Sequence, residues 1–407
     1  MKILVADMKK KRPWLDCDNG ELTNVLNKYG NVEVVVKTQL ESDEYADEIT
    51  NEIYDAIVVH VEHQNIRQVR SAIEILKKHQ NKIVLYGYGV KFDEQLGSLE
   101  FAIGSNDVHQ VVNCINKILG TTIEYPYGSM VGSDYSALNI SSIYNYPIRY
   151  SKGCENACPF CERSLEKSKE YRSPEDFEEE LRIAVSKYSA KAVTFLDASL
   201  LGGVGNRFVE DIVPILEKYH ISWRANGVTL SSIDEKKVSL LKKSGCYLLS
   251  IGIESLAENV RTGKKINHSQ LANTLSVLKQ NEIYSLGFFI CGLEGDTLEK
   301  SVRSFELVKE LDMDIKLFSS AVALPGTVLW NYVNKNGKFL CDICDVFPDS
   351  KTIIHFETQE FTAEEREQFI RHTEILREQN HMAIDSIRAK IKCPWSISEK
   401  ENIIWKT

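Results

Sequence analysis

Residues 151–161 read Ser-Lys-Gly-Cys-Glu-Asn-Ala-Cys-Pro-Phe-Cys, so that Cys154, Cys158 and Cys161 are separated by three and then by two residues. Three thiolates at this spacing can bind three irons of a [4Fe-4S] cluster and leave the fourth iron without a protein ligand. A structural zinc site is the alternative. Zinc prefers four ligands in paired groups, whereas no Cys or His follows within thirty residues of Cys161. The spacing therefore predicts an iron–sulfur site with one open iron.

The same spacing, with the aromatic Phe160 directly before the third Cys, resembles the signature of the radical S-adenosylmethionine (SAM) superfamily. The resemblance implies that the amino and carboxylate groups of SAM chelate the open iron and that one electron splits the sulfonium. A 5'-deoxyadenosyl radical then abstracts hydrogen from a substrate. The protein's part in such chemistry is to position the reactants and to exclude water.

Two segments after the cysteines resemble the superfamily's contacts with the methionine part of SAM. Thr194-Phe-Leu-Asp-Ala-Ser199 implies that Asp197 binds the ammonium group. Ile221-Ser-Trp-Arg-Ala-Asn226 implies that Arg224 pairs with the carboxylate. A turn or helix-capping role for Asp197, and a plain salt bridge for Arg224, are the structural alternatives.

Three later segments resemble the superfamily's remaining strand-end motifs. Gly252-Ile-Glu-Ser255 implies that Glu254 helps to hold the nucleotide, with burial against a Lys or Arg as the alternative. Gly287-Phe-Phe-Ile-Cys-Gly-Leu-Glu-Gly-Asp-Thr297 implies close backbone approach to the adenine at Gly292. Ala323-Leu-Pro-Gly-Thr-Val-Leu329 resembles the turn that closes the last strand.

The first part of the chain, residues 1–120, alternates short apolar runs with helical stretches. This pattern predicts a parallel, doubly wound, Rossmann-like domain. The expected strands are Lys2–Ala6, Val32–Val36, Ala56–His60 and Lys82–Tyr86, and the expected helices are Glu21–Asn27, Arg67–Lys78 and Val108–Leu119.

The second part of the chain follows an expected linker, residues 121–147, which is rich in Tyr, Ser, Gly and Pro. Residues 148–332 resume the alternation and predict a partial (β/α)6 barrel, whose site lies at the carboxyl ends of its strands. Residues 333–407 are expected to be mostly helical, around Ala363–Lys390. The expected barrel strands lie near Pro147–Tyr150, Ala192–Leu196, Ile221–Ala225, Tyr247–Ile253, Ser285–Cys291 and Lys316–Ala323, and the helices at 174–188, 206–219, 234–243, 268–281 and 297–311.

A doubly wound domain before such a barrel resembles the cobalamin-binding-domain branch of the radical SAM superfamily. The resemblance implies bound cobalamin, with Tyr86, Gly87 and Gly89 at the strand end where that branch often has a glycine pair. The D-x-H-x-x-G motif that supplies an axial His elsewhere is absent. His60 follows a strand at the expected mouth of the domain, where a polar loop residue is the alternative to a cobalamin ligand. Cobalamin is thus implied by architecture.

Composition limits the class of protein. The 407 residues include 43% hydrophobic and 26% charged residues, which is typical of a globular protein. A net charge of −9 argues against a large nucleic-acid surface. With no signal peptide pattern and no run of about 18 apolar residues, we expect a cytoplasmic protein outside the membrane. The ten Cys do not form a disulfide framework, which indicates a reducing compartment.

The function expected from these features is reductive cleavage of SAM for cobalamin-dependent methylation of a carbon centre in a small molecule or peptide. A reductant such as flavodoxin or ferredoxin is the implied partner. A cobalamin-independent rearrangement, epimerisation, cyclisation or C–S bond formation, with the first domain recognising substrate, is the alternative, and a non-catalytic metal-binding protein is a third. Cys341, Cys344 and Cys393 are weighed as a second metal site, with ordinary thiols as the alternative.

Overall fold

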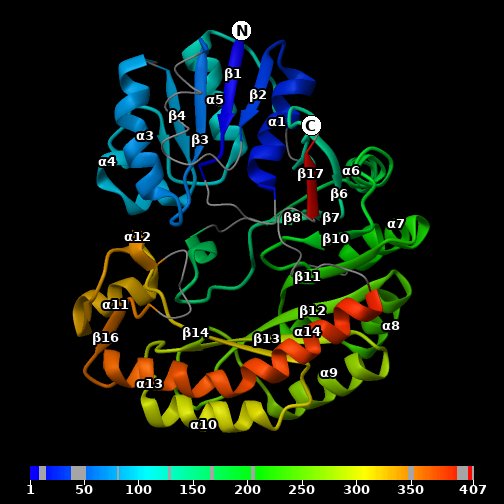
Figure 1. Ribbon diagram of the computed structural model, residues 1–407, viewed down its shortest axis with the longest axis vertical. Helices are drawn as coiled ribbons and strands as arrows, with labels where there is room; N and C mark the ends of the chain where they lie inside the picture. The colour runs from blue at the N-terminus through cyan, green and yellow to red at the C-terminus, as the bar shows by residue number, and fades with distance from the viewer. Residues whose placement is uncertain are drawn as a thin grey trace. The chain divides into compact units, whose positions relative to one another are not determined.

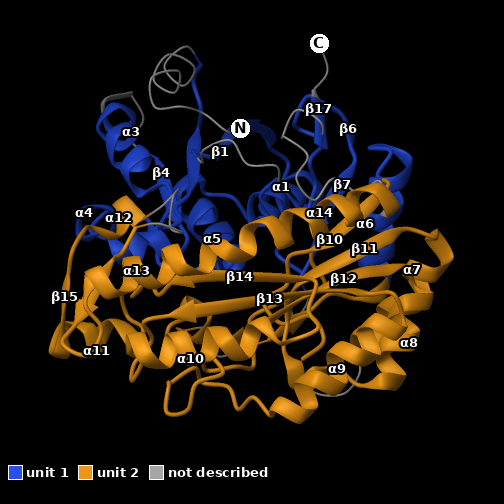
Figure 2. Cartoon of the chain, turned by 60° about the horizontal axis from the view of Figure 1, so that its bottom comes forward, with its two compact units in different colours: residues 1–148, 175–190, 397–407 blue, residues 149–174, 191–396 orange. Residues whose placement is uncertain are grey.

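The computed structural model describes residues 1–8, 15–37, 52–79, 82–126, 130–165, 169–202, 207–346, 353–391 and 402–405. The chain forms two compact units, which Figure 2 colours separately. Unit 1 comprises residues 1–148, 175–190 and 397–407, and unit 2 comprises residues 149–174 and 191–396. No helix within the described ranges is long and apolar enough to cross a membrane.

Unit 1 is built on a five-stranded parallel sheet of order β2-β1-β3-β4-β5 (Figure 1). Its central strands are buried on both faces, as expected of a sheet that helices cover. Helices α1 and α5 pack on the same core, because Leu22 and Val111 share one apolar cluster with Val5. The elements are β1 (Lys2–Ala6), α1 (Cys17–Tyr29), β2 (Glu33–Lys37), β3 (Ala56–His60), α3 (Ile66–His79), β4 (Ile83–Tyr86), a 3-10 turn (Tyr88–Phe92), α4 (Glu94–Gly97), β5 (Ala102–Ile103) and α5 (Val108–Leu119).

The helix ends in this sheet follow local capping rules. Asp16 precedes α1 and accepts hydrogen bonds from the backbone N–H groups of Asp18 and Asn19, and Asp107 caps α5 in the same way. Gly120 ends α5 in the left-handed conformation. Unit 1 is completed by β6 (Ile140–Ile143), β7 (Asn145–Ile148), most of α6 (Pro174–Ser186) and β17 (Ile403–Trp405), of which β6 and β17 pair antiparallel.

Unit 2 contains five parallel strands in the consecutive order β10 to β14. Because the strands run parallel, the residues that follow them meet at one edge of the sheet. The elements are β8 (Ser151–Lys152), a 3-10 turn (Glu162–Leu165), β9 (Glu170–Tyr171), β10 (Ala192–Phe195), a π-turn (Phe208–Ile212), α7 (Val213–Tyr219), β11 (Ser222–Val228), a 3-10 turn (Leu230–Ser232), α8 (Glu235–Lys243), β12 (Cys246–Glu254), α9 (His268–Gln280), β13 (Tyr284–Cys291), α10 (Leu298–Lys309) and β14 (Ile315–Ser320).

The carboxyl-terminal part of unit 2 lies along β14 (Figure 1). Asn380 of α14 accepts a hydrogen bond from Lys316 N at 2.9 Å and donates one to Lys316 O at 2.8 Å. These bonds satisfy backbone groups of the last strand in the order and protect an open sheet edge. The elements are α11 (Val328–Asn336), β15 (Gly337–Phe339), α12 (Ile343–Val346), β16 (Phe356–Thr358), α13 (Ala363–Thr373), a 3-10 turn (Glu374–Leu376) and α14 (Arg377–Ile391).

The expected α/β class is confirmed, and the carboxyl-terminal region is more varied than expected. The expected helical stretch around Ala363–Lys390 is present as α13 and α14, which a 3-10 turn at Glu374–Leu376 separates. Leu376 in this turn packs with Phe369 and Phe305 in one apolar cluster. The antiparallel pair β15–β16 also lies in this region. The proposed domain limits at residues 120, 147 and 332 stay a prediction.

His355 links the carboxyl-terminal region to the segment after β14 and makes stability depend on pH. Its buried Nδ1 accepts a hydrogen bond from Ala323 N at 3.2 Å, and burial lowers its pKa to about 4. The pKa in the unfolded chain is near 6.5, so protonation favours unfolding, and the stabilisation present above pH 6.5 is lost as the pH falls toward 4. We expect the free energy of unfolding to fall by about 2 kcal/mol between pH 7 and pH 5 from this group.

Urea unfolding of the wild type and of H355Q at both pH values measures this contribution. Other groups titrate in both proteins. The difference between the two proteins in how much the free energy of unfolding changes from pH 7 to pH 5 therefore isolates the contribution of His355. Equal pH dependence in both proteins would rule out this role.

Candidate active site

The three predicted cluster ligands lie on one loop of unit 2, between β8 and the 3-10 turn Glu162–Leu165. Cys158 is buried, Cys154 and Cys161 are partly exposed, and all three are free thiols. Asn156 donates hydrogen bonds to Cys154 Sγ from its backbone N at 3.4 Å and from Nδ2 at 3.5 Å. Burial raises the pKa of Cys158 to about 11, which Lys264 opposes. Metal binding must therefore displace a proton from this thiol.

The described residues do not hold the three sulfur atoms as close together as a single bound metal ion would require. A tetrahedral zinc with Zn–S bonds of about 2.3 Å holds its thiolates about 3.8 Å apart. Within the described residues, the three cysteines are not among the His, Cys, Asp and Glu groups whose ligand atoms all lie within 4.8 Å of one another. An iron–sulfur cluster binds each thiolate to a different iron, so it accommodates wider spacing.

Asp197, which follows β10, anchors the amino-terminal side of the cysteine loop. Its buried carboxylate accepts hydrogen bonds from Tyr150 N at 3.2 Å, from Ser151 N at 2.5 Å and from Ser151 Oγ at 2.7 Å. Burial raises the pKa of Asp197, and these three donors oppose the shift. The bonds occupy three of about four acceptor positions of a carboxylate. The expected contact with a methionyl ammonium stays a prediction.

Glu155 provides a second anchor that the sequence did not reveal. Its Oε1 accepts a hydrogen bond from Ser199 Oγ at 2.6 Å, and its Oε2 lies 3.3 Å from Lys169 Nζ. Lys169 also donates to Ser199 O at 2.6 Å and to Gly202 O at 2.7 Å. The residue directly after the first cysteine is therefore tied to the segment that follows β10.

Glu254, the last residue of β12, forms a buried ion pair near the cysteine loop. Lys264 Nζ lies 2.7 Å from Glu254 Oε1 and 3.1 Å from Gly252 O. Burial alone would lower the pKa of Lys264, but Glu254 and the thiols of Cys158 and Cys154 raise it. A side chain at the neighbouring Gly263 would contact Cys158 Cα at 3.0 Å, so the backbones approach closely there. Whether Glu254 also holds a nucleotide stays a prediction.

Arg224 and Gly292, the two other residues expected to contact SAM, are each hydrogen-bonded to neighbouring side chains in unit 2. Arg224 lies within β11, where its Nε donates to Thr194 Oγ1 at 3.0 Å. Gly292 follows β13 with a φ of +85°, which favours glycine. Its N–H donates to Asp296 Oδ2 at 2.7 Å, and its carbonyl accepts from Arg366 Nη1 at 3.3 Å. Asp296 and Arg366 are contacts of the turn that sequence reasoning missed.

A pocket of about 300 Å³ in unit 2 opens beside the third cysteine. The strands β13 and β14 and the cysteine loop supply its lining. Phe160, which the cysteine motif singled out, meets Leu293, the residue after Gly292, within one apolar cluster here. The apolar lining is formed by Phe160, Ile290, Leu293, Ala321, Val322 and Leu324, and the polar lining by Cys161, Glu162, Ser319 and Ser320.

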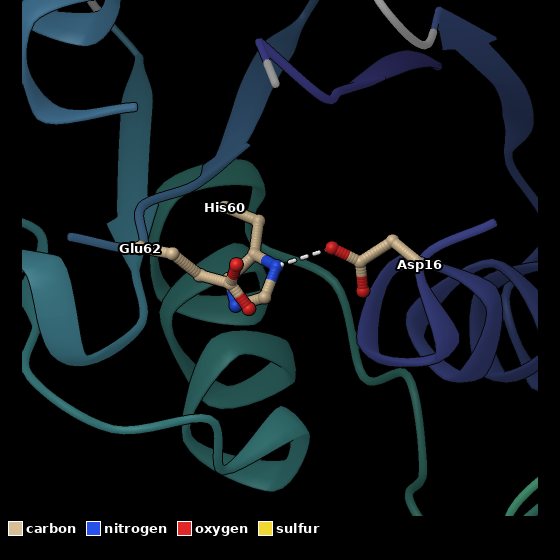
Figure 3. Close-up of side chains that lie close together, drawn as sticks. All are labelled: Asp16, His60 and Glu62. Atoms are coloured by element: carbon tan, nitrogen blue, oxygen red, sulfur yellow. Dashed lines mark hydrogen bonds and ion pairs between the residues drawn. The ribbon is translucent and has the colours of Figure 1, made fainter. Parts of the chain in front are cut away.

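In unit 1, His60 at the end of β3 lies in a buried polar network (Figure 3). Its Nδ1 lies 2.6 Å from Asp16 Oδ2, and its Nε2 lies 3.3 Å from Asn106 Oδ1. Among the described residues, Asp16, His60 and Glu62 form the group of metal-type ligands with atoms within 4.8 Å of one another. The imidazole also stacks on Tyr86 at 4.5 Å. Both ring nitrogens are thus engaged inside the unit.

The other residues weighed for cobalamin lie at the carboxyl end of β4. Tyr86 is fully buried, and its hydroxyl donates to Asn19 Oδ1 at 2.8 Å. Gly87 has a φ of +117°, and a Cβ on Gly87 would collide with Val61 O. Gly89 likewise packs against the backbone of Glu62. The two glycines allow close packing on the end of β3, and their contact with a corrin stays a prediction.

A second metal site in the carboxyl-terminal region is not assembled by the described residues. Cys341 is partly exposed and Cys344 is buried, and within the described ranges they belong to no disulfide and to no group of three close ligands. Cys393 lies outside the described residues.

The Glu254–Lys264 pair should contribute strongly to stability. Removing one partner of a buried ion pair costs roughly 3 kcal/mol or more, so E254Q should lower the free energy of unfolding by at least that amount in urea titrations. The double variant E254Q/K264M, which removes both charges, should recover most of the loss. D312N, which breaks the exposed Lys279–Asp312 pair, should cost below about 1 kcal/mol. An E254Q protein as stable as D312N would contradict the assignment.

Comparison with known proteins identifies the domain that carries the cysteine loop. Residues 148–308 match the model of the radical SAM superfamily. Over 194 residues the chain is 31% identical to an uncharacterized methyltransferase of Pyrococcus horikoshii. The aligned region covers 47% of this chain and 42% of that protein. Over 215 residues it is 26% identical to bacteriochlorophyllide d C-12(1)-methyltransferase of Chlorobaculum tepidum, covering 50% and 46%. The match spans less than half the length of either relative.

Solved structures show a similar fold over a larger part of the chain. TsrM of Kitasatospora setae, a radical SAM methyltransferase solved with cobalamin and a [4Fe-4S] cluster bound, matches with a TM-score of 0.67 at 12% identity, covering 100% of this chain and 91% of that one. OxsB, a cobalamin-dependent SAM radical enzyme, matches with a TM-score of 0.61 at 14% identity, covering 93% and 61%. The likeness confirms the expected architecture. The cysteine loop lies inside residues 148–308, the segment of this chain that matches the radical SAM superfamily.

Proposed function

We propose that this chain cleaves SAM reductively at a [4Fe-4S] cluster held by Cys154, Cys158 and Cys161. The observation that supports this most is that two sets of hydrogen bonds, through Asp197 and through Glu155, tie the cysteine loop to the segment after β10. When bound, the cluster supplies the electron that breaks the sulfonium bond of SAM. The loop's role is to hold three thiolates rigidly while the remaining iron stays open.

The pocket beside Cys161 is the proposed site of the SAM nucleoside. Its apolar walls, with Phe160 and Leu293, suit an adenine ring and exclude water from the reacting sulfonium. Gly292 begins the turn that places Leu293 in the pocket wall, and its missing side chain leaves room for Arg366 behind that turn. In this proposal Asp197 uses its remaining acceptor position for the ammonium, and Arg224 pairs with the carboxylate.

We propose methylation as the reaction, with unit 1 as the cobalamin domain. The order β2-β1-β3-β4-β5 places a ligand crevice at the carboxyl ends of β1 and β3. A small cavity beside the carboxyl end of β1 has Asp7, which follows that strand, and Asp16 and Asn19 in its lining. Two curated relatives are named methyltransferases, and TsrM binds cobalamin. Cobalamin would supply a methyl carrier, and the acceptor would be a carbon centre in a small molecule or peptide.

The proposed reaction needs an electron donor such as flavodoxin or ferredoxin, and these carriers favour a cytoplasmic setting. The net charge of −9 argues against nucleic acid as the substrate.

The cluster assignment predicts which thiols are required. After anaerobic reconstitution with iron and sulfide, the wild type should produce 5'-deoxyadenosine from SAM with dithionite as reductant. C158A should produce none, because two thiolates do not hold the cluster for SAM. C114A changes a partly buried thiol of unit 1 and should keep wild-type activity. Equal SAM cleavage by C158A and the wild type would overturn the assignment.

The cobalamin assignment predicts corrin in the purified protein. Protein produced anaerobically with cobalamin supplied should show corrin absorption bands at close to one corrin per chain after gel filtration. SAM cleavage by protein that never retains corrin would contradict cobalamin use. That result would instead favour a cobalamin-independent rearrangement, epimerisation, cyclisation or C–S bond formation, with unit 1 recognising the substrate.

A further inference from the structure

One fully buried cation lies outside the matched radical SAM segment and contacts the turn after β13. Arg366 belongs to α13 and is 1% exposed, whereas the matched segment ends at residue 308. A charge in the protein interior is costly unless it is paired or hydrogen-bonded. We therefore expect the guanidinium of Arg366 to be held by specific hydrogen bonds or ring contacts.

The guanidinium of Arg366 is fixed by its own neighbours in the carboxyl-terminal region. Its Nε donates to Phe361 O at 3.1 Å. Its central carbon lies 4.3 Å from the ring centroid of Phe356 and 4.9 Å from that of Phe361. Cation–π contacts with two rings and a backbone hydrogen bond hold the planar group in one orientation.

In that orientation Arg366 reaches the turn that begins at Gly292. Its Nη1 donates to Gly292 O at 3.3 Å. A Cβ at Gly292 would collide with the guanidinium, so the two groups are in direct contact. The carboxyl-terminal region thus fixes the carbonyl oxygen of Gly292 through Arg366.

The amide side of the same turn is held by Asp296. This buried carboxylate accepts hydrogen bonds from Gly292 N at 2.7 Å, from Thr297 N at 2.9 Å and from Ser301 Oγ at 2.7 Å. Burial raises the pKa of Asp296, and these donors together with the positive charge of Arg366 oppose the shift. Gly292 is therefore clamped at its nitrogen by Asp296 and at its oxygen by Arg366.

We infer that Arg366 is a positioning residue for SAM: it sets the conformation of the Gly292 turn and thereby the affinity of the pocket for the nucleoside. Leu293, the next residue, lines the pocket beside Phe160, so a shift of the turn moves a pocket wall. The inference rests on the proposed function, since it assumes that this pocket takes SAM. It assigns to the carboxyl-terminal region a part in cofactor binding.

The test compares R366K with the wild type after cluster reconstitution. Lysine keeps the charge but lacks the planar fork that meets Phe361 O and Gly292 O together. We expect the dissociation constant for SAM, measured by anaerobic equilibrium dialysis, to rise about tenfold, as for loss of one charge-assisted hydrogen bond. The cluster absorption spectrum should stay unchanged, because the hydrogen bonds of Arg366 go to Phe361 and Gly292 and not to the cysteines. R371K, at an exposed position of the same helix, should bind SAM like the wild type.

A second variant keeps the inference testable if R366K does not fold. S301A retains Arg366 and removes one donor to Asp296, so it should loosen the amide side of the clamp and raise the dissociation constant twofold or more. Thermal unfolding midpoints of all variants show whether binding is measured on folded protein.

The outcomes separate this inference from the function on which it rests. Wild-type protein that carries a cluster and does not bind SAM would overturn the proposed function. Wild type and folded R366K that bind SAM with equal affinity would overturn the inference and leave the proposed function intact.

Discussion

The buried carboxylate of Asp197 is the contact on which the rest of the candidate site depends. A cysteine loop alone would hold its thiolates loosely, because fixing each backbone residue costs about 1–2 kcal/mol of conformational entropy. Asp197 offsets this cost by accepting three hydrogen bonds from Tyr150 and Ser151, which lie three to four residues before the first cysteine. Charge-assisted bonds in a buried setting are among the stronger contacts available to a protein. Because Asp197 follows β10, a strand of the parallel sheet, these bonds fix the start of the cysteine loop relative to the sheet.

The remaining strand ends complete the same arrangement. The segment after β12 contributes the Glu254–Lys264 pair and a close backbone approach at Gly263, and the turn after β13 contributes a pocket wall at Leu293. The carboxyl-terminal region reaches this turn through Arg366. Unit 2 is therefore more than a sheet with loops, because residues beyond the matched superfamily segment support the pocket that lies beside the third cysteine.

The fold could be predicted from the sequence where a strand is a continuous apolar run. The limits of β1 and β3 were predicted to the residue, as were those of α5, because Val- and Ile-rich runs and capping residues mark them locally. Strands of two or three residues were not predicted, because so few residues show no clear hydrophobic periodicity. These elements are β5 (Ala102–Ile103), β8 (Ser151–Lys152), β9 (Glu170–Tyr171), β15 (Gly337–Phe339), β16 (Phe356–Thr358) and β17 (Ile403–Trp405).

The site was predictable only in part, for a physical reason. Cysteine spacing is a local property, so the cluster loop is visible in the sequence, whereas partner choice for a buried charge depends on tertiary contacts. Lys169, Lys264 and Arg366 belong to ordinary-looking segments, and only the fold brings them to Glu155, Glu254 and Gly292.

The central claim is that the three-cysteine loop leaves one iron open for SAM. Electron–nuclear double resonance of the reduced wild-type cluster with SAM labelled with 15N at its amino group tests it most directly. The account predicts a hyperfine coupling from the label that shows nitrogen bound to one iron. A cluster that forms and is reduced, yet shows no coupling to the label at saturating SAM, would contradict it.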